Sequence, residues 1–327
     1  MMIVSLKDVA QAKKAITPYV HHTPLFHSNT FSKICGANFH MKCENLQKTG
    51  SFKVRGALNN LLNMSPEQRK NGVVTASSGN HAQGVAYAAQ LLGVRCVLCM
   101  QNWSSPAKVS ACRAYGAEVR LVDGDSADTL VEAERLRDAH GYEFIHPFNS
   151  ALTIAGQGTI GFEILKDLPD VDAVIVPISG GGLASGVGVT LKELYPNIKI
   201  YGVQPENSAA MRLALNQGHV VRIDRCDTCC DGLTAIMVGE ATLEMVKRYL
   251  DDVITLTEAE IKEAVVTTLQ YTKMMVEPSS ATAIAAILNK RVPIKGNVVA
   301  VVTGGNCSMQ FLSEVLEETK CKLPSQK

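Results

Sequence analysis

Lys53 is the residue of this sequence whose neighbours most clearly indicate covalent chemistry. It ends the run Lys48-Thr49-Gly50-Ser51-Phe52-Lys53, in which a glycine, hydroxyl groups and an aromatic ring accompany the amine. A lysine amine attacks an aldehyde in its neutral form, and partial desolvation lowers its pKa towards that form. A lone lysine is more often a solvated surface charge, so the interpretation depends on partners elsewhere in the chain.

Three distant segments supply partners of the right chemical kind. They are a polar loop (Ser77-Ser78-Gly79-Asn80-His81), a glycine-rich segment that opens a helix (Ser179-Gly180-Gly181-Gly182-Leu183) and a segment that follows a strand (Thr303-Gly304-Gly305-Asn306). Glycines let the backbone approach an anion closely, and the amides at a helix start face it. A reactive amine, a polar loop, a phosphate cradle and a hydroxyl loop are the parts that a pyridoxal-phosphate site needs.

These four segments, in this order, resemble the fold-type II pyridoxal-phosphate enzymes, in the branch of serine/threonine dehydratases (ammonia-lyases) and serine racemases. The resemblance extends over nearly the whole chain. It implies an α/β fold like that of the tryptophan synthase β chain, with two domains that each hold a mainly parallel twisted sheet flanked by helices. It also implies a large cofactor-binding domain over 1–71 and 148–327, a small inserted domain over 72–147, and a cofactor in the cleft between them.

The resemblance also implies a role for each matching residue. Lys53 holds pyridoxal phosphate covalently, Phe52 packs beside it, and the segment Ser179, Gly180, Gly181, Gly182 and Leu183 holds the phosphate. Asn80 contacts the phenolic oxygen, Thr303 lies beside the pyridine nitrogen, Glu277 lies near the ring, and Ser77, Ser78, Asn80 and His81 bind the substrate. Each residue also has an ordinary interpretation. Phe52 could be a core aromatic, Ser77 or Asn80 a helix cap, His81 a structural histidine, Thr303 a strand-end cap and Glu277 a partly buried charge at a helix end.

Ser78 bears most directly on the reaction. Racemisation needs a second acid/base opposite Lys53, and a serine fills that position in serine racemases, although some dehydratases carry it too. His146-Pro147-Phe148-Asn149 resembles the dehydratase version of its segment. We therefore predict an ammonia-lyase that converts L-threonine and L-serine to a 2-oxo acid and ammonia, with Lys53 and Ser78 as catalytic residues. The alternatives are a serine racemase, alone or bifunctional, a hydroxyaspartate ammonia-lyase, and a member without turnover.

A nicotinamide dehydrogenase is the remaining α/β alternative. Gly180 to Gly182 with Gly186 have a register similar to the dinucleotide fingerprint. The following strand, however, ends in Gln204, where the fingerprint requires an acidic residue.

A divalent metal site is expected in many relatives, after the strand that ends in Val203. Here Gln204 and Ala210 stand where carboxylates would be, and Glu206 alone does not replace them. Magnesium and calcium prefer carboxylate oxygens, so we predict no standard divalent site and name no metal ligand. A weaker cation site at Gln204 stays open.

Composition limits the function classes. The 327 residues carry a formal net charge of +1, without the basic excess that nucleic acids or anionic membranes require. No apolar run is long enough to span a bilayer, and the first residues lack the basic-then-apolar pattern of a signal peptide. We therefore expect a cytoplasmic protein. A homodimer is the family expectation, with a small amino acid as the substrate.

The thiols of Cys96-Val97-Leu98-Cys99 are predicted to be core residues. Cys226-Asp227-Thr228-Cys229-Cys230 indicates reactive or oxidisable thiols more than a zinc site.

Alternating strands and helices must position the four segments, and this alternation predicts parallel sheets covered by helices. Ser105-Pro106 and Thr257 to Glu260 are helix-start signals. The predicted strands are Val73–Thr75, Cys96–Leu98, Glu118–Val122, Ala173–Val176, Ile198–Tyr201 and Val298–Val302. The predicted helices include Val54–Leu62, His81–Leu92, Ser126–Ala139, Ile154–Leu168, Leu183–Leu194 and Ser308–Glu318.

Overall fold

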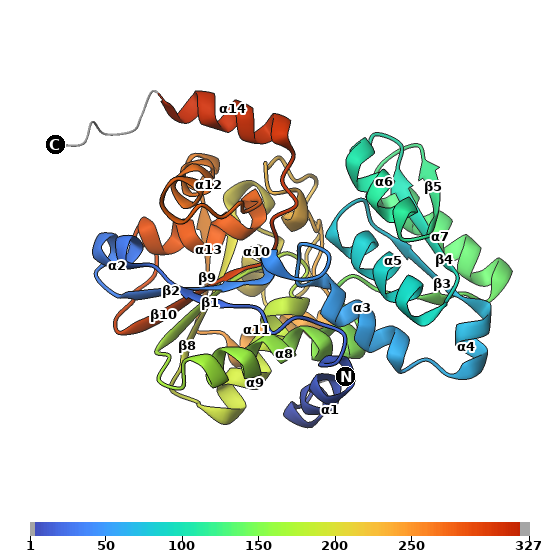
Figure 1. The fold of residues 1–327 in the computed structure, drawn as a ribbon, viewed down its shortest axis with the longest axis horizontal. Helices are drawn as coiled ribbons and strands as arrows, with labels where there is room; N and C mark the ends of the chain where they lie inside the picture. The colour runs from blue at the N-terminus through green and yellow to red at the C-terminus, as the bar shows by residue number, and fades with distance from the viewer. Residues whose placement is uncertain (1–3, 321–327) are drawn as a thin grey trace.

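The computed structural model describes residues 4–320, which are built around two separate β-sheets (Figure 1). The larger sheet has the strand order β1-β2-β10-β7-β8-β9, and all its neighbouring strands are parallel except β1 and β2. Its strands are β1 (Leu25–His27), β2 (Asn38–Cys43), β7 (Ala173–Pro177), β8 (Lys199–Pro205), β9 (Asp252–Leu256) and β10 (Asn297–Val302).

The smaller sheet is entirely parallel and has the order β5-β4-β3-β6. All its strands come from one continuous stretch of chain between β2 and β7. They are β3 (Val73–Ala76), β4 (Cys96–Gln101), β5 (Glu118–Val122) and β6 (Glu143–Phe144). With α5 (Asn80–Leu92), α6 (Pro106–Ala114) and α7 (Ser126–His140) it forms the right-hand part of the molecule in Figure 1.

The remaining helices surround the larger sheet or join the two parts. They are α1 (Leu6–Ile16), α2 (Asn29–Cys35), α3 (Lys53–Leu62), α4 (Pro66–Asn71), α8 (Ala151–Asp167), α9 (Gly182–Leu194), α10 (Ala210–Gln217), α11 (Glu240–Tyr249), α12 (Glu258–Thr272), α13 (Pro278–Leu288) and α14 (Met309–Lys320).

The larger sheet is buried on both faces, as its runs of β-branched residues require. Successive side chains of a strand point to opposite faces, and β10 shows the consequence. Val298, Ala300 and Val302 pack into one hydrophobic core with α12 and α13, whereas Val299 and Val301 pack into a second core with α8 and α9.

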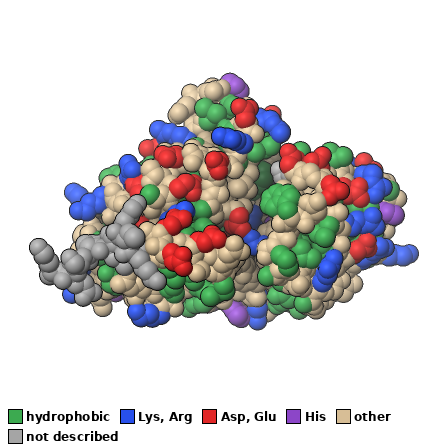
Figure 2. Space-filling model, turned by 90° about the horizontal axis from the view of Figure 1, so that it is seen from above, with side chains coloured by type: hydrophobic (Ala, Val, Ile, Leu, Met, Phe, Trp, Pro, Cys, Tyr) green, Lys and Arg blue, Asp and Glu red, His purple; other side chains and the backbone are tan. Residues whose placement is uncertain are grey.

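Helix α3 connects the two parts of the molecule. It packs against α8 beside the larger sheet and against α5 beside the smaller one. The approach to α5 is close, because a Cβ placed on Gly84 would lie 3.1 Å from the carbonyl carbon of Lys53. The first residue of α3 is Lys53, so the junction of the two sheets positions this lysine. Seen from above, the surface is hollowed between the two parts (Figure 2).

The predicted alternation of strands and helices is confirmed, with shifts at the element ends. Three predicted helix starts are one residue late, since α3, α5 and α9 begin at Lys53, Asn80 and Gly182. Strands β1, β2, β6 and β9 are not predicted. Two of them are short, and all four include exposed or half-exposed positions that weaken the hydrophobic pattern.

The local signals gave mixed results. The capping box at Thr257 is confirmed. Ser105 is the N-cap residue of α6 and Pro106 is its first residue, as expected, although the Ser105 side chain makes no capping hydrogen bond. The thiols of Cys96 and Cys99 are buried in β4, as predicted.

The domain boundaries proposed at residues 71/72 and 147/148 stay a prediction. Within residues 4–320, no helix is long and apolar enough to cross a membrane.

Candidate active site

The amine of Lys53 is held at the junction of the two sheets. Its Nζ donates a hydrogen bond of 3.1 Å to the carbonyl oxygen of Pro147 and lies 5.3 Å from the ring centroid of Phe52. Burial of the amine lowers the pKa of Lys53 to about 8, while the charge of Glu277 acts in the opposite direction. Near neutral pH a larger fraction of this amine is therefore neutral than of an exposed lysine.

The segment after β10 is bound to the segment that carries Lys53. The backbone N–H of Phe52 donates to the carbonyl oxygen of Thr303 at 3.0 Å, and that of Gly305 donates to Gly50 at 2.9 Å. The hydroxyl of Thr303 is buried and lies 2.9 Å from that of Ser280 in α13. Two of the four predicted segments are thus brought together by backbone hydrogen bonds.

Asn80 connects the polar loop to the larger sheet. Its Nδ2 donates to Glu277 Oε1 at 2.8 Å, and its Oδ1 accepts from Asn306 Nδ2, also at 2.8 Å. Burial raises the pKa of Glu277 to about 7, and the nearby charge of Asp231 adds to this effect. Close to Glu277, Lys108 of α6 forms an ion pair with Asp231, which belongs to the part of the molecule that contains the larger sheet.

The glycine segment follows β7 and opens α9, and its backbone requires glycine. Gly181 has φ +96°, in the left-handed region that glycine favours. A Cβ on Gly180 would overlap the ring of Phe148, and a Cβ on Gly182 would lie 2.7 Å from the Phe148 carbonyl oxygen. The hydroxyl of Ser179 accepts the N–H of Ala235 at 3.1 Å, and Leu183 packs into the core.

The side chains of the polar loop have different partners. Ser78 Oγ donates to Gln101 Oε1 at 2.9 Å and accepts the Gln101 N–H at 3.0 Å. Ser77 Oγ accepts the N–H of Gly79 at 3.3 Å. Gly79 is the N-cap residue of α5, and no side chain caps this helix by a hydrogen bond. The alternative that Ser77 or Asn80 caps it is therefore wrong.

His81 is buried and neutral. Its Nε2 lies 3.0 Å from the carbonyl oxygen of Ile145, which identifies Nε2 as the protonated nitrogen. Burial, together with the charge of Lys53, lowers the pKa of His81 to about 3.

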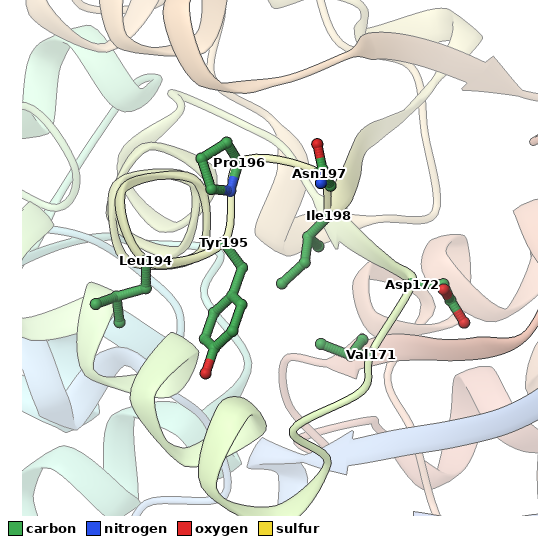
Figure 3. Close-up of a pocket in the computed structure, with 7 residues that line it drawn as sticks. All are labelled: Val171, Asp172, Leu194, Tyr195, Pro196, Asn197 and Ile198. Atoms are coloured by element: carbon green, nitrogen blue, oxygen red, sulfur yellow. The ribbon is translucent and has the colours of Figure 1, made fainter.

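A separate hollow of about 250 Å³ lies at the amino ends of β7 and β8 in the larger sheet (Figure 3). It is lined by residues 171–172 and 194–198, which precede β7 and β8. Ligands of open α/β sheets bind at the carboxyl ends of the strands. This hollow is therefore not part of the candidate site.

The comparison with known proteins decides the family. The model of the family described as "Pyridoxal-phosphate dependent enzyme" matches residues 16–304. The chain belongs to this family of pyridoxal-phosphate-dependent enzymes.

Similar proteins agree on the branch of the family. The chain is 42% identical to an L-threonine ammonia-lyase of Thermotoga maritima over 97% of this chain and 79% of the relative. Among solved structures, maize serine racemase matches with a TM-score of 0.92 and 33% identity, over 98% of both chains. The processed form of threonine deaminase isoform 2 from Solanum lycopersicum matches with a TM-score of 0.92 and 34% identity, over 98% of this chain and 91% of that one. The predicted resemblance and fold class are confirmed.

The residues at the junction fit pyridoxal phosphate. The hydroxyls of Thr49 and Ser51 and the Nδ1 of His81 are buried without a hydrogen-bond partner within residues 4–320. Unpaired buried polar atoms are costly, so a bound group that pairs with them would stabilise the fold. The first backbone N–H groups of α9 have no intrahelical partner, and they suit a phosphate.

The segment expected to lack divalent-metal ligands holds itself together by hydrogen bonds. Gln204 Oε1 accepts the N–H of Arg212 at 3.0 Å, and Gln204 Nε2 donates to the Ser208 carbonyl oxygen at 3.4 Å. Ala210 is buried and apolar. Within residues 4–320, no group of three or more His, Cys, Asp or Glu side chains could hold a metal ion. The metal expectation stays a prediction.

Sequence reasoning missed several residues that shape the site. Ser280 contacts Thr303, Gln101 contacts Ser78, and Pro147 accepts from Lys53. His146 and Pro147 stand in a segment that the sequence singles out, but the sequence does not indicate what they contact. The contacts of Ser280, Gln101 and Pro147 join residues 23 to 94 positions apart, so no local pattern specifies them.

Proposed function

We propose that the protein is an ammonia-lyase that converts L-threonine and L-serine to a 2-oxo acid and ammonia. The observation that carries this proposal is the amine of Lys53, which has a lowered pKa and lies at the junction of the two sheets. The chain is 42% identical to an L-threonine ammonia-lyase over 97% of its length, and this similarity supports the choice of substrate.

We propose the same cofactor contacts that the sequence predicts. Lys53 would hold pyridoxal phosphate, the segment 179–183 would hold its phosphate, and Phe52, Asn80, Glu277 and Thr303 would surround its ring. When bound, the cofactor draws electrons from the substrate and makes the Cα proton acidic. Thr303 carries a hydroxyl, which unlike a carboxylate does not hold a pyridine nitrogen protonated, and this favours elimination over transamination.

The chain's own residues would then bind the substrate and move its protons. Ser77, Ser78, Asn80 and His81 would lie around the substrate carboxylate. Lys53 Nζ would accept the Cα proton, which its lowered pKa allows. The β-hydroxyl would take up that proton and leave as water, and the enamine that remains would react with water to give the 2-oxo acid and ammonia.

The test is the formation of 2-oxo acid from L-threonine and from L-serine by the purified full-length protein. We expect activity with both, and none with L-alanine, which has no β-hydroxyl to lose. Absence of 2-oxo acid from both substrates, with the cofactor bound, would reject the proposal.

Serine racemase is the second candidate, because Ser78 stands in the polar loop and maize serine racemase matches over 98% of both chains. D-Serine measured in the L-serine incubation separates the two. Substantial D-serine would place the racemase first, whereas 2-oxo acid without D-serine would support the lyase alone.

A homodimer and a cytoplasmic location are further parts of the proposal. Light scattering on the protein as it elutes from a size-exclusion column measures its mass and tests the homodimer. Fractionation of the source cells tests the second.

A further inference from the structure

His146 accepts two backbone hydrogen bonds at one ring nitrogen. Its Nδ1 accepts the N–H of Phe148 at 3.2 Å and that of Asn149 at 2.9 Å. A nitrogen that accepts hydrogen bonds carries no proton, so the ring proton of the neutral imidazole is on Nε2. The ring thereby closes a turn over residues 146–149, between β6 and α8.

This turn contacts two parts of the cofactor site, Lys53 and the glycine segment. At one end, the Pro147 carbonyl oxygen accepts from Lys53 Nζ at 3.1 Å. At the other, Phe148 packs on the glycine segment so closely that a Cβ on Gly180 would overlap its ring and a Cβ on Gly182 would lie 2.7 Å from its carbonyl oxygen.

The ring of His146 is itself well fixed. The ring packs edge-on against the ring of Phe148, with the two centroids 4.7 Å apart. The backbone carbonyl oxygen of His146 accepts a hydrogen bond from Thr153 Oγ1 at 3.0 Å. Burial, followed by the charge of Lys53, lowers the pKa of His146 to about 4. The ring is therefore neutral at physiological pH, as its two accepted hydrogen bonds require.

We propose that His146 is a positioning residue that sets the placement of Lys53 relative to the phosphate-binding glycine segment, by holding the turn that touches both. It acts through backbone groups, without contact to the reacting atoms. The inference rests on the proposed use of Lys53 and residues 179–183 for the cofactor. It does not depend on the amino-acid substrate, so the cofactor is measured apart from turnover.

The test compares two variants of the full-length protein that differ in the acceptor. His146→Leu removes the acceptor, whereas His146→Asn keeps one, because Asn Oδ1 and His Nδ1 are both two bonds from Cβ. We expect His146→Leu to raise the dissociation constant for pyridoxal phosphate by about tenfold or more, since two hydrogen bonds are lost. We expect His146→Asn to stay within about threefold of the wild type. His219→Leu, at an exposed histidine of a remote loop, is the control and should change nothing.

Two results would overturn the proposal. One is a folded His146→Leu variant that binds pyridoxal phosphate like the wild type. The other is a His146→Asn variant that loses as much affinity as His146→Leu, because the acceptor would then not be what matters. Normal cofactor affinity with no turnover in the wild type would instead count against the proposed function.

A second measurement covers the case in which His146→Leu does not fold. Nitrogen-15 NMR of the histidine rings reports which ring nitrogen carries the proton, and His146→Asn assigns the His146 signals by their loss. At neutral pH we expect Nδ1 to be unprotonated and Nε2 protonated. A proton on Nδ1 would exclude both accepted hydrogen bonds and overturn the proposal.

Discussion

The side-chain amide of Asn80 donates a 2.8 Å hydrogen bond to Glu277 Oε1, across the two parts of the molecule. Asn80 begins α5 beside the smaller sheet, and Glu277 is the N-cap of α13 beside the larger one. The oxygen of the same amide accepts from Asn306. One residue of the smaller part is thus bound to two segments of the larger part, next to a carboxyl group whose pKa is raised.

Glu277→Gln tests that raised pKa through stability. Glu277 has a folded-state pKa of about 7 against an ordinary value of 4.5. Its contribution to stability is therefore present below about pH 4.5 and is lost as the pH rises through about 7. We expect the stability of the variant relative to the wild type to rise by up to roughly 3 kcal/mol between pH 4.5 and pH 8, because glutamine has no charge to bury.

Urea unfolding of the cofactor-free protein at both pH values measures this difference. Glu67→Gln, at an exposed glutamate of α4, is the control and should show no such trend. A pH-independent difference for Glu277→Gln would mean that the carboxyl group is not buried as described.

Lys53→Ala should abolish turnover and also change stability. Loss of the group that accepts the Cα proton should lower the rate of 2-oxo acid formation by at least about 10²-fold. The amine has a folded-state pKa of about 8 against 10.5, so the folded protein favours its neutral form. The cost of burying the charged amine is present below about pH 8 and disappears as the pH rises towards 10.5.

Removing the amine should therefore stabilise the cofactor-free protein at pH 7 more than at pH 10. Activity assays and urea unfolding measure the two effects. The control is Lys48→Ala, at an exposed lysine five residues earlier. Normal turnover by Lys53→Ala would reject the mechanism.

Gly180→Ala should weaken cofactor binding, because its Cβ would overlap the ring of Phe148. Overpacking of this kind costs about 1–3 kcal/mol and moves the backbone that faces the phosphate. Gly218→Ala is the matched control. Gly218 has φ +80°, but open space surrounds the position of its Cβ, so this variant has backbone strain without a clash. We expect both variants to lower the melting temperature and only Gly180→Ala to lower cofactor affinity. Equal affinities would contradict the role of the glycine segment.

The sequence was sufficient to predict the segments and the parallel sheets, but not the contacts that connect them. Lys53 and residues 179–183 have local signals, since an amine in a glycine and hydroxyl context and consecutive glycines before a helix have few uses. The Lys53 contact to Pro147 spans 94 residues, and the Asn80 contact to Glu277 spans 197. Such contacts depend on how the sheets pack, which hydrophobic periodicity does not specify. The role of Ser280 was missed for the same reason.

Ser78→Ala separates elimination from racemisation. Elimination needs Lys53 to take the Cα proton from one face, whereas racemisation also needs a proton delivered to the opposite face. Ser78 Oγ donates to Gln101 Oε1 and accepts the Gln101 N–H, so its hydroxyl is held in a defined place. We expect Ser78→Ala to keep 2-oxo acid formation from L-threonine within about tenfold of the wild type and to abolish any D-serine formation from L-serine.

The comparison with Ser77→Ala makes this interpretation specific. The Ser77 hydroxyl accepts a hydrogen bond from Gly79 N–H at 3.3 Å, so Ser77→Ala changes the same loop while it leaves the Ser78 hydroxyl in place. If the two variants lower elimination and D-serine formation in parallel, Ser78 acts through the shape of the loop. If Ser78→Ala alone stops D-serine formation while elimination continues, the hydroxyl carries the second proton, because loss of loop shape would slow both reactions.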